Sequence, residues 1–523
     1  MISFIPSWYN PNRIWYSTDS AWFQKNEVRD FDDISTQLRF FQKGAEVIEL
    51  IVLNYAPNLR RFIHRQNVMQ VSYWSVFDEI QAFEHDYVHP INYLELEWAG
   101  NVSFHFNPFI VTVMRNTELY ARVHLSRDGT LVSIEYYRNG HLAYEHVYDD
   151  RGFLSSILMY DQSGGPDKQI YLNKGGDWVF FEFIKTGRIE ISPKHKEFFQ
   201  KSEYGSLDEL ICERLEAHLE KGGRTDTLVL ALDKQHNRMV LDALGKQNLV
   251  LSHFKGRVND KFSELVTAAK ARFSDRSQSE DEKAMAEEEP AFQKLRRLSI
   301  YPFENRPTFG ASANEANLYI SFYIDNLSLT EIENVITKIM KQLTENEKTR
   351  LLLLTFRASS LDYLKKVKGM VQKYNSLLQS PEKKPEDSLD VEIMKTKETE
   401  EKIQIVSINR QTELLQTMAK TRVFIDLGEA INNHLNIEAV SSGVPQINQA
   451  ENSFCAHKQS GYTVQNMDQI PEALDYFLVG LKNWNESLIF YKQLKDKFTG
   501  QQILTRWETM REAILDEDSA NRS

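Results

Sequence analysis

The stretch RVFIDLGEAINNHLNIEAVSSGVPQIN, residues 422–448, decides the fold class of this chain. Its apolar run RVFIDL predicts a short buried strand, and a helix is expected before Gly443, which we interpret as the helix C-cap. Pro445 then opens a second short strand, PQIN. Strand, loop, helix, turn and strand in this order are typical of a doubly wound parallel sheet.

The same alternation continues on either side of this stretch. LYISFYI, RLLLLTF and IQIVSI predict three more buried strands, at residues 318–324, 350–356 and 403–408. Ser328 and Glu331 form a capping box at the start of the helix after the first of them. That helix places six apolar residues on one face: Ile332, Val335, Ile336, Ile339, Met340 and Leu343. With closing helices expected near residues 488–498 and 501–510, we assign residues 301–523 to a C-terminal Rossmann-like domain.

A second α/β pattern opens the chain and returns after residue 194. The runs ISFIPSW and AEVIELIVLNY predict strands near the start. After residue 194, SLDELICERLEAHLEK predicts an amphipathic helix, and DTLVLALD and NLVLSHF predict buried strands. We expect all these strands to join one sheet, so that residues 1–90 and 194–300 are the two parts of an N-terminal Rossmann-like domain.

Residues 91–193, which lie between the two parts, carry a different pattern. Apolar and polar residues alternate there, and the turn signals Asp128-Gly129, Asn139-Gly140 and Asp150-Arg151-Gly152 recur about every eleven residues. Asp-Gly and Asn-Gly supply the positive φ angles that tight hairpins require. This segment is therefore predicted to be an inserted antiparallel β-meander domain of roughly six to nine strands.

Composition narrows the classes of function. The chain has 523 residues and a formal net charge of −12, with no basic stripe of the kind that nucleic-acid binding needs. Two cysteines favour a reducing cytoplasm. We expect neither a signal peptide nor a membrane-spanning helix, so any membrane association would be peripheral and through partners. The acidic segment at residues 274–290 is interpreted as a solvated loop in preference to a docking segment.

The segment EAVSSGVP, residues 438–445, resembles the nucleotide-sugar segment of retaining glycosyltransferases with two Rossmann-like domains. The resemblance implies a glycosyltransferase B-type arrangement, with a crevice between the carboxyl ends of the strands of the two domains. In such enzymes an Arg and a Lys after the first strand of the C-terminal domain neutralise the diphosphate. A glycine-rich loop admits the phosphates, and a carboxylate accepts the ribose hydroxyls.

This sequence departs from that pattern at each point. No Gly-Arg or Lys follows the first C-terminal strand, where Asp325 instead brings negative charge. Glu438 matches the second glutamate of the motif, but the first position holds Ala430. Glu429 is adjacent, and a slip of one residue turns a side chain by about 100° on a helix. The glycine loop is replaced by INNHLN. We therefore predict a vestigial donor site at Glu438, Ala430, Gly443 and Asp325, with no catalytic residue.

Some residues keep two interpretations. Glu438 could bind a ribose or serve as a carboxylate at a helix N-terminus, and His434 could be a catalytic base or a solvated loop side chain. Trp8 and Tyr9, after the first strand, either pack the strand end or stack on a ligand, and Asn433 is a further possible contact to a ligand or partner. No HExxH, paired CxxC or P-loop motif occurs, so we expect no metal and no cofactor.

The start MISFIPSWY, the inserted meander and the segment LNIEAVSSGVPQIN together resemble one family over essentially the full length. It is the glycosyltransferase-like component of the accessory Sec export system, the first of the accessory secretory protein families. The resemblance implies a non-catalytic cytoplasmic protein needed for export of a glycosylated serine-rich-repeat adhesin. It further implies a scaffold or co-chaperone role with other accessory Sec proteins, among them an acetyltransferase-like partner and the accessory Sec ATPase.

Two alternatives from other classes remain open at the level of sequence. The chain could be an active retaining glycosyltransferase that modifies the adhesin with Glu438 and a rearranged phosphate site. It could instead be the chaperone subunit of a protein O-glycosyltransferase. Stabilisation by millimolar nucleotide sugar would favour the first, and co-purification with a transferase would favour the second.

Overall fold

The computed structural model describes fifteen segments of the chain: residues 1–10, 12–17, 32–83, 89–107, 110–126, 128–221, 225–253, 263–274, 294–300, 309–356, 361–379, 401–408, 411–429, 431–450 and 454–522. These segments form two compact units. The first contains the described residues up to Ile300 together with those from Leu504 onward, and the second contains the described residues from 309 to Ile503.

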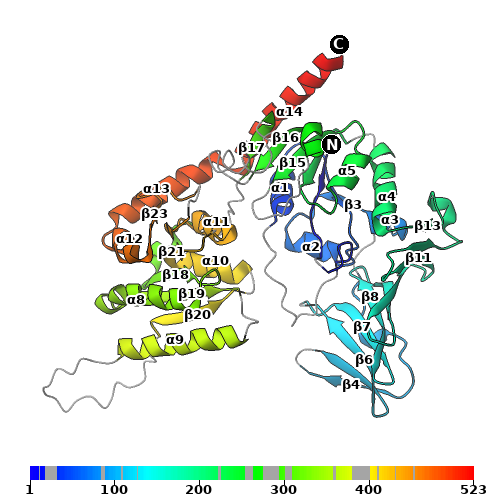
Figure 1. Ribbon diagram of the computed structural model, residues 1–523, viewed down its shortest axis with the longest axis horizontal. Coiled ribbons are helices and arrows are strands. Elements are labelled where there is room, and N and C mark those ends of the chain that lie inside the picture. Colours follow the sequence, from blue (N-terminus) through cyan, green and yellow to red (C-terminus); the bar gives the residue numbers. More distant parts are fainter. Residues whose placement is uncertain are drawn as a thin grey trace. The chain divides into compact units, whose positions relative to one another are not determined.

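The first unit is built on a parallel sheet of seven strands (Figure 1). Its order is β17-β16-β15-β14-β1-β2-β3. The strands are β1 (Ile2–Ile5), β2 (Ile48–Val52), β3 (Ser72–Ser75), β14 (Thr227–Ala231), β15 (Asn248–His253), β16 (Ala269–Ser274) and β17 (Arg296–Ser299). Helices α1 (Asp33–Phe41), α2 (Leu59–Arg65), α3 (Val76–Ile80), α4 (Leu207–Lys221), α5 (Asn237–Ala243) and α6 (Ser263–Ala268) connect them. Strands from before and after the insertion therefore join one sheet, as the sequence predicts.

The insertion is a single antiparallel sheet of ten strands, in the sequential order β4 to β13. Its strands are β4 (Val102–Phe106), β5 (Val111–Arg115), β6 (Glu118–Leu125), β7 (Leu131–Arg138), β8 (His141–Asp149), β9 (Phe153–Tyr160), β10 (Pro166–Leu172), β11 (Trp178–Phe183), β12 (Ile189–Ile191) and β13 (Glu203–Tyr204). Nine of these strands, β4 to β12, lie within residues 91–193, at the upper end of the expected six to nine, and the short strand β13 pairs with β12 from beyond residue 193. One face packs on the parallel sheet's core through Val147, Tyr171, Phe180 and Ile189.

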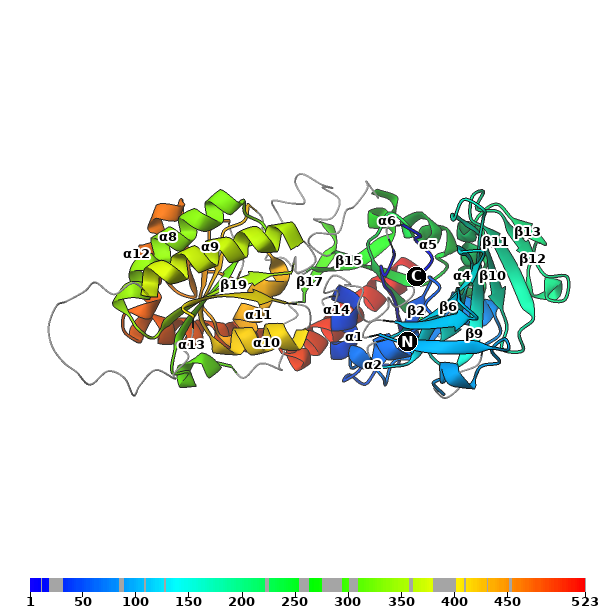
Figure 2. The ribbon, with the colours of Figure 1, turned by 90° about the horizontal axis from the view of Figure 1, so that it is seen from below.

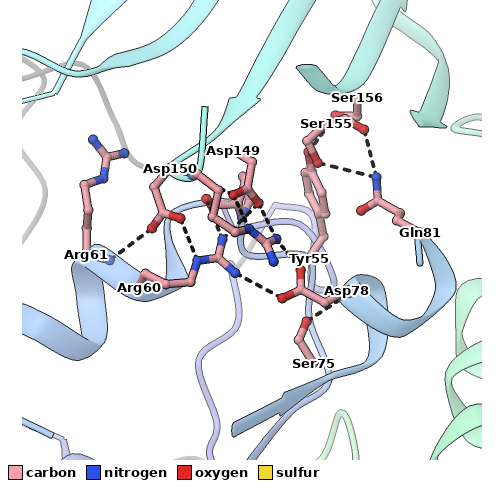
Figure 3. A network of polar contacts seen from close by, with 12 residues as sticks. Tyr55, Arg60, Arg61, Ser75, Asp78, Gln81, Asp149, Asp150, Ser155 and Ser156 are labelled. Atoms are coloured by element: carbon pink, nitrogen blue, oxygen red, sulfur yellow. Dashed lines mark hydrogen bonds and ion pairs between the residues drawn. The ribbon is translucent and has the colours of Figure 1, made fainter. Parts of the chain in front are cut away.

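A buried network of charged residues joins this meander to the first unit's helices (Figure 3). Arg60 of α2 donates to Asp150 at 2.6 Å, to Asp149 at 2.9 Å and to Asp78 of α3 at 3.0 Å. Arg151 donates to both oxygens of Asp149 and to Asp78, at 2.7–2.8 Å. Residues Asp150-Arg151-Gly152 form a turn, as predicted. The side chains of Asp150 and Arg151 are buried, and their ion pairs hold the meander against α2 and α3.

The second unit is a parallel sheet of six strands in the order β20-β19-β18-β21-β22-β23. The strands are β18 (Leu318–Tyr323), β19 (Thr349–Thr355), β20 (Ile403–Ser407), β21 (Thr421–Asp426), β22 (Gln446–Asn448) and β23 (Gly461–Thr463). Helices α8 (Leu329–Glu345), α9 (Leu361–Gln379) and α12 (Ile470–Leu478) lie on one face, and α10 (Gln411–Lys420), α11 (Asn433–Ser442) and α13 (Lys482–Lys497) lie on the other (Figure 2). The predicted capping box of Ser328 and Glu331 is confirmed at the start of α8.

The last helix, α14 (Gly500–Arg522), packs with the first unit from Leu504 onward. Trp507 is buried there in an aromatic cluster, with ring centroids 5.7 Å from Phe41 of α1 and 5.4 Å from Phe273 of β16. The sequence analysis had grouped this helix with the C-terminal domain. No helix in the described part of the chain is long and apolar enough to cross a membrane.

Candidate functional site

The topology of the second unit places its switch point between β18 and β21. From β18 the chain winds outward through β19 to β20, then returns to place β21 on the opposite side of β18. Ligands of doubly wound sheets bind at the carboxyl ends of the strands that flank such a point. The loops after β18 and β21 are therefore where a nucleotide diphosphate would be sought, and each carries an aspartate there: Asp325 and Asp426.

Asp325 is buried and engaged by the neighbouring strand. Its Oδ1 accepts a hydrogen bond from Thr355 Oγ at 2.5 Å, and its Oδ2 accepts one from the backbone N–H of Phe356 at 2.7 Å. Both partners lie at the end of β19. Asp325 thus ties the loop after β18 to the end of β19, and it places a carboxylate where a diphosphate-binding site needs cations.

Asp426 fills the second loop. Its Oδ2 accepts hydrogen bonds from the backbone N–H of Asn432 at 2.7 Å and from the side-chain amide of Asn436 at 2.8 Å. The side-chain amide of Asn448, on β22, donates in turn to the side-chain oxygen Oδ1 of Asn436 at 3.0 Å. Burial raises the pKa of Asp426, while the hydrogen bonds from Asn432 and Asn436 act in the opposite direction.

This network changes what the start of α11 can bind. The N-terminus of a helix after a parallel strand attracts anions through its backbone N–H groups and dipole. Here Asp426 supplies an internal carboxylate to Asn432, the N-cap, and the Asn432 side chain accepts from Leu435 N–H at 3.1 Å. The INNHLN segment therefore forms a capped helix start, and Asn433 is its first helical residue, half-buried.

Glu438 lies in the middle of α11, with its side chain 2% exposed. Its Oε1 is 3.8 Å from Nε2 of His434, one turn earlier. Burial and Lys492 lower the pKa of Lys495 on α13, and the Glu438 carboxylate opposes that change. Two expectations are thus wrong: Glu438 is not in the first turn of its helix, and His434 is a helical side chain facing Glu438, not a solvated loop residue.

Gly443 ends α11 in the left-handed conformation, with φ of +75°, so the predicted C-cap is confirmed. A Cβ atom at this position would lie 2.7 Å from Leu488 Cδ2 and 3.0 Å from the ring of Phe309. Glycine is therefore needed both for its backbone angle and for the close approach of α13.

The first unit has its own switch point, between β1 and β14. Ser7 donates a hydrogen bond to Asp233, and the Tyr9 hydroxyl is hydrogen-bonded to His236, so the loop after β1 is tied to the loop after β14. Trp8 packs edge-on against Phe62 of α2, with ring centroids 4.5 Å apart. The two aromatic residues are half-buried against protein neighbours, as the packed-strand-end interpretation expects.

Two predicted features lie outside the described residues: Ala430, and all but the first residue of the acidic segment at 274–290. Among the described residues no group of three or more His, Cys, Asp or Glu side chains is arranged to hold a metal ion. Sequence reasoning missed Asp426 and its amide partners. The signal available was the Asp-Leu that ends RVFIDL, followed by Gly428 and then by Asn432, Asn436 and Asn448.

Two units with parallel sheets, carboxyl-edge loops and an inserted meander define a protein of the glycosyltransferase B-type fold. The crystal structure of the pneumococcal O-GlcNAc transferase GtfA in complex with UDP and GlcNAc is similar in fold, with a TM-score of 0.68 at 11% identity over 98% of this chain and 99% of that one.

The chain belongs to the family of accessory Sec system protein 1, whose model matches residues 1–513. It is 30% identical to the accessory Sec system protein 1 of Streptococcus gordonii, over 99% of this chain and 100% of the relative. It is also similar to a chain in the crystal structure of accessory secretory proteins 1, 2 and 3 of Streptococcus pneumoniae, with a TM-score of 0.85, 27% identity and coverage of 99% and 100%. The chain is thus an accessory Sec system component with a glycosyltransferase-like fold.

Proposed function

We propose that this chain is a non-catalytic scaffold of the accessory Sec system that serves the export of a glycosylated serine-rich-repeat adhesin. The observation that carries the proposal is the internal carboxylate of Asp426 on the N-cap residue of α11. A helix start that already holds an anion repels a diphosphate, and Asp325 adds a second negative charge beside the same switch point. The fold remains, but the group that a transferase must neutralise has no place there.

The vestigial donor positions support the same conclusion. Glu438 is buried against His434 and in the field of Lys495, so it would have to leave these neighbours to accept ribose hydroxyls. Neither Asp325 nor Gly443 offers a hydrogen-bond donor to a phosphate. Asp325 is an acceptor that is hydrogen-bonded to Thr355 of β19, and Gly443 is the C-cap of α11. We assign these positions, with Ala430, to the structure of a former donor site.

The partners follow from the family. The Streptococcus pneumoniae structure holds accessory secretory proteins 1, 2 and 3 together, and we propose that this chain assembles with the corresponding proteins of its own organism. One of these would be the acetyltransferase-like partner, and the assembly would deliver the serine-rich-repeat substrate to the accessory Sec ATPase. We place it in the cytoplasm, reaching the membrane only through its partners, because the net charge of −12 disfavours binding to anionic lipid.

Calorimetry with UDP-N-acetylglucosamine and with UDP tests the loss of donor binding. We expect no saturable heat at micromolar concentrations and no release of sugar. Asp426→Asn is the informative variant, because it removes the internal charge and keeps the size of the side chain and one acceptor oxygen. Saturable micromolar binding by the unaltered chain would contradict the proposal and favour an active transferase.

Deletion of this gene alone, followed by cell fractionation, tests the export role. We expect the adhesin to disappear from the cell surface and to accumulate inside the cell with its sugars attached. An adhesin that reaches the surface without its sugars would contradict the export role, because it would show that the chain serves glycosylation.

A further inference from the structure

A buried arginine at the amino-terminal edge of the second unit's sheet has no carboxylate beside it among the described residues. Arg422 is the second residue of β21, at the end opposite to Asp426, and the residue is 6% exposed. Its guanidinium carbon lies 3.4 Å from the ring centroid of Trp484, on α13. Among the described residues, the Arg422 side chain makes no hydrogen bond and no ion pair in addition to this stack.

The ring beneath the guanidinium has an unused donor as well. Trp484 is 3% exposed, and its Nε1 is buried without a hydrogen-bond acceptor among the described residues. Buried polar groups are almost always hydrogen-bonded, because losing water without a replacement partner is unfavourable. Trp484 Nε1 is such a group, and its ring lies on α13 against the Arg422 guanidinium of β21, so the pair offers a position that an acceptor can complete.

The pKa of Arg422 is that of a buried cation without a counter-charge. Burial alone lowers the pKa of Arg422 to about 10, and no neighbouring acid opposes that change. A planar guanidinium stacked on an aromatic ring keeps its edge donors in one plane, which suits a carboxylate that accepts two hydrogen bonds side by side.

The surroundings favour a protein as the source of that carboxylate. Val479 and Leu481, on either side of Gly480, are 73% and 62% exposed. Leu481 is the N-cap of α13 and lies three residues before Trp484, so the two residues are neighbours on one side of the helix start. A free anion gains nothing from exposed leucine and valine, whereas a docked polypeptide would cover them.

We propose that the Arg422–Trp484 pair is a docking site for an acidic side chain of a partner protein, whose apolar neighbours cover Val479 and Leu481. The inference rests on the proposed assembly with the other accessory secretory proteins, which supply the partner. The site lies at the opposite edge of the sheet from the donor loops, so it is separate from the former donor site.

The test compares the unaltered full chain with Arg422→Met and Arg422→Lys in capture of co-expressed accessory secretory proteins 2 and 3. Arg350→Met is the matched control. Arg350 is also the second residue of its strand, β19, but its guanidinium donates to the carbonyl of Glu347 at 2.5 Å. We expect Arg422→Met to weaken capture at least about tenfold, Arg422→Lys to recover part of the loss, and Arg350→Met to change it less than about twofold.

Thermal unfolding of the isolated chain provides the second measurement. Removing a buried cation that has no counter-charge should raise Tm by about 2 °C in Arg422→Met. Unchanged capture by Arg422→Met, whether Tm rises or falls, would overturn the inference and leave Arg422 a packing residue. If inorganic phosphate stabilises the unaltered chain but not Arg422→Met while capture is unchanged, the site binds a free anion and the inference is also overturned. An unaltered chain that captures neither protein would contradict the proposed assembly itself.

Discussion

Two buried arginine sites in this protein differ in how their charge is balanced. At the junction of the meander and the first unit, Arg60 and Arg151 share the carboxylates of Asp78, Asp149 and Asp150. At the amino-terminal edge of the second unit's sheet, Arg422 has an aromatic ring and, in the part of the chain that the structure describes, no carboxylate. The two sites are comparably buried, so the difference lies in the partners and not in exposure to solvent.

The pKa values follow the partners. Burial acts to lower the pKa of Arg60, but Asp149, Asp78 and Asp150 outweigh it and the pKa lies above its usual value. Arg422 experiences burial alone, and its pKa falls to about 10. A closed network holds two parts of a fold together, whereas a buried charge without a counter-charge costs stability. Four predictions test this contrast.

The largest effect is expected at the closed network. Arg60→Met should lower the free energy of unfolding by about 3–5 kcal/mol, because it leaves buried carboxylates without their cation. Urea unfolding followed by tryptophan fluorescence measures the loss. Arg238→Met is the control, since Arg238 is 71% exposed and its surface ion pairs contribute less than about 1 kcal/mol. A loss below 1 kcal/mol in Arg60→Met would remove the distinction from Arg422.

A half-buried histidine in the meander extends the contrast to pH. His146 packs against Tyr136, with ring centroids 4.8 Å apart, and burial lowers its pKa to about 4. The unfolded chain therefore takes up this proton first, and the contribution to stability is complete above pH 6.5 and lost as pH falls toward 4. Between pH 7 and pH 4.5 the loss should be about 2 kcal/mol for a half-buried ring.

Urea unfolding at the two pH values, in the unaltered chain and in His146→Gln, isolates this term from the other titrating groups. We expect His146→Gln to lose about 2 kcal/mol less than the unaltered chain over the same interval. Equal losses in the two proteins would mean that His146 finds an acceptor when it is protonated.

The third prediction concerns the helix that carries Trp484. Gly443→Ala forces an L-residue to φ of +75° and brings its Cβ to 2.7 Å from Leu488, one turn after Trp484 on α13. We expect a loss of about 2 kcal/mol from backbone strain and displacement of α13. Gly480→Ala, at φ of +79° with no atom within 4 Å, separates the strain from the clash and should lose about 1 kcal/mol. Similar losses of unfolding free energy in both variants would show that α13 shifts away from the new Cβ atom at little cost.

The smallest effect is expected at Glu438. Glu438→Gln keeps the size of the side chain and removes the charge near His434 and Lys495. Because we assign no catalytic role to Glu438, surface display of the adhesin should be unchanged, as measured by whole-cell immunoblotting beside the unaltered strain. Loss of the adhesin's sugars in this variant would restore the transferase interpretation.

Much of the fold can be predicted from local sequence patterns. The alternation of buried strands with helices identifies both parallel sheets, and Gly443 with the Ser328–Glu331 box marks helix ends, because these signals act over a few residues. The Gly turns of the meander are local in the same way. The tenth strand, beyond residue 193, could not be predicted because a strand as short as Glu203–Tyr204 has no periodicity of its own.

The candidate site could be predicted only in part. The sequence shows that the Arg and Lys expected after β18 are absent, and that the first glutamate and the glycine loop expected before Glu438 are replaced, because a motif can be compared residue by residue. It does not show that Asp426 takes the place of an external anion, because that depends on a loop bringing Asn432 and Asn436 back to the strand end.

The sequence by itself determined the order of elements, the inserted meander and the erosion of the donor motif. Only the tertiary structure decided which charged side chains are buried and which groups they contact. The Asp150-Arg151 turn reads as an exposed hairpin, yet its charges are buried between α2 and α3. Arg422 is a charged residue near the start of a strand, which the sequence gives no reason to bury, yet Trp484 of α13, about sixty residues later, covers it. Burial and charge balance depend on contacts between segments far apart in the chain, and local patterns carry no information about them.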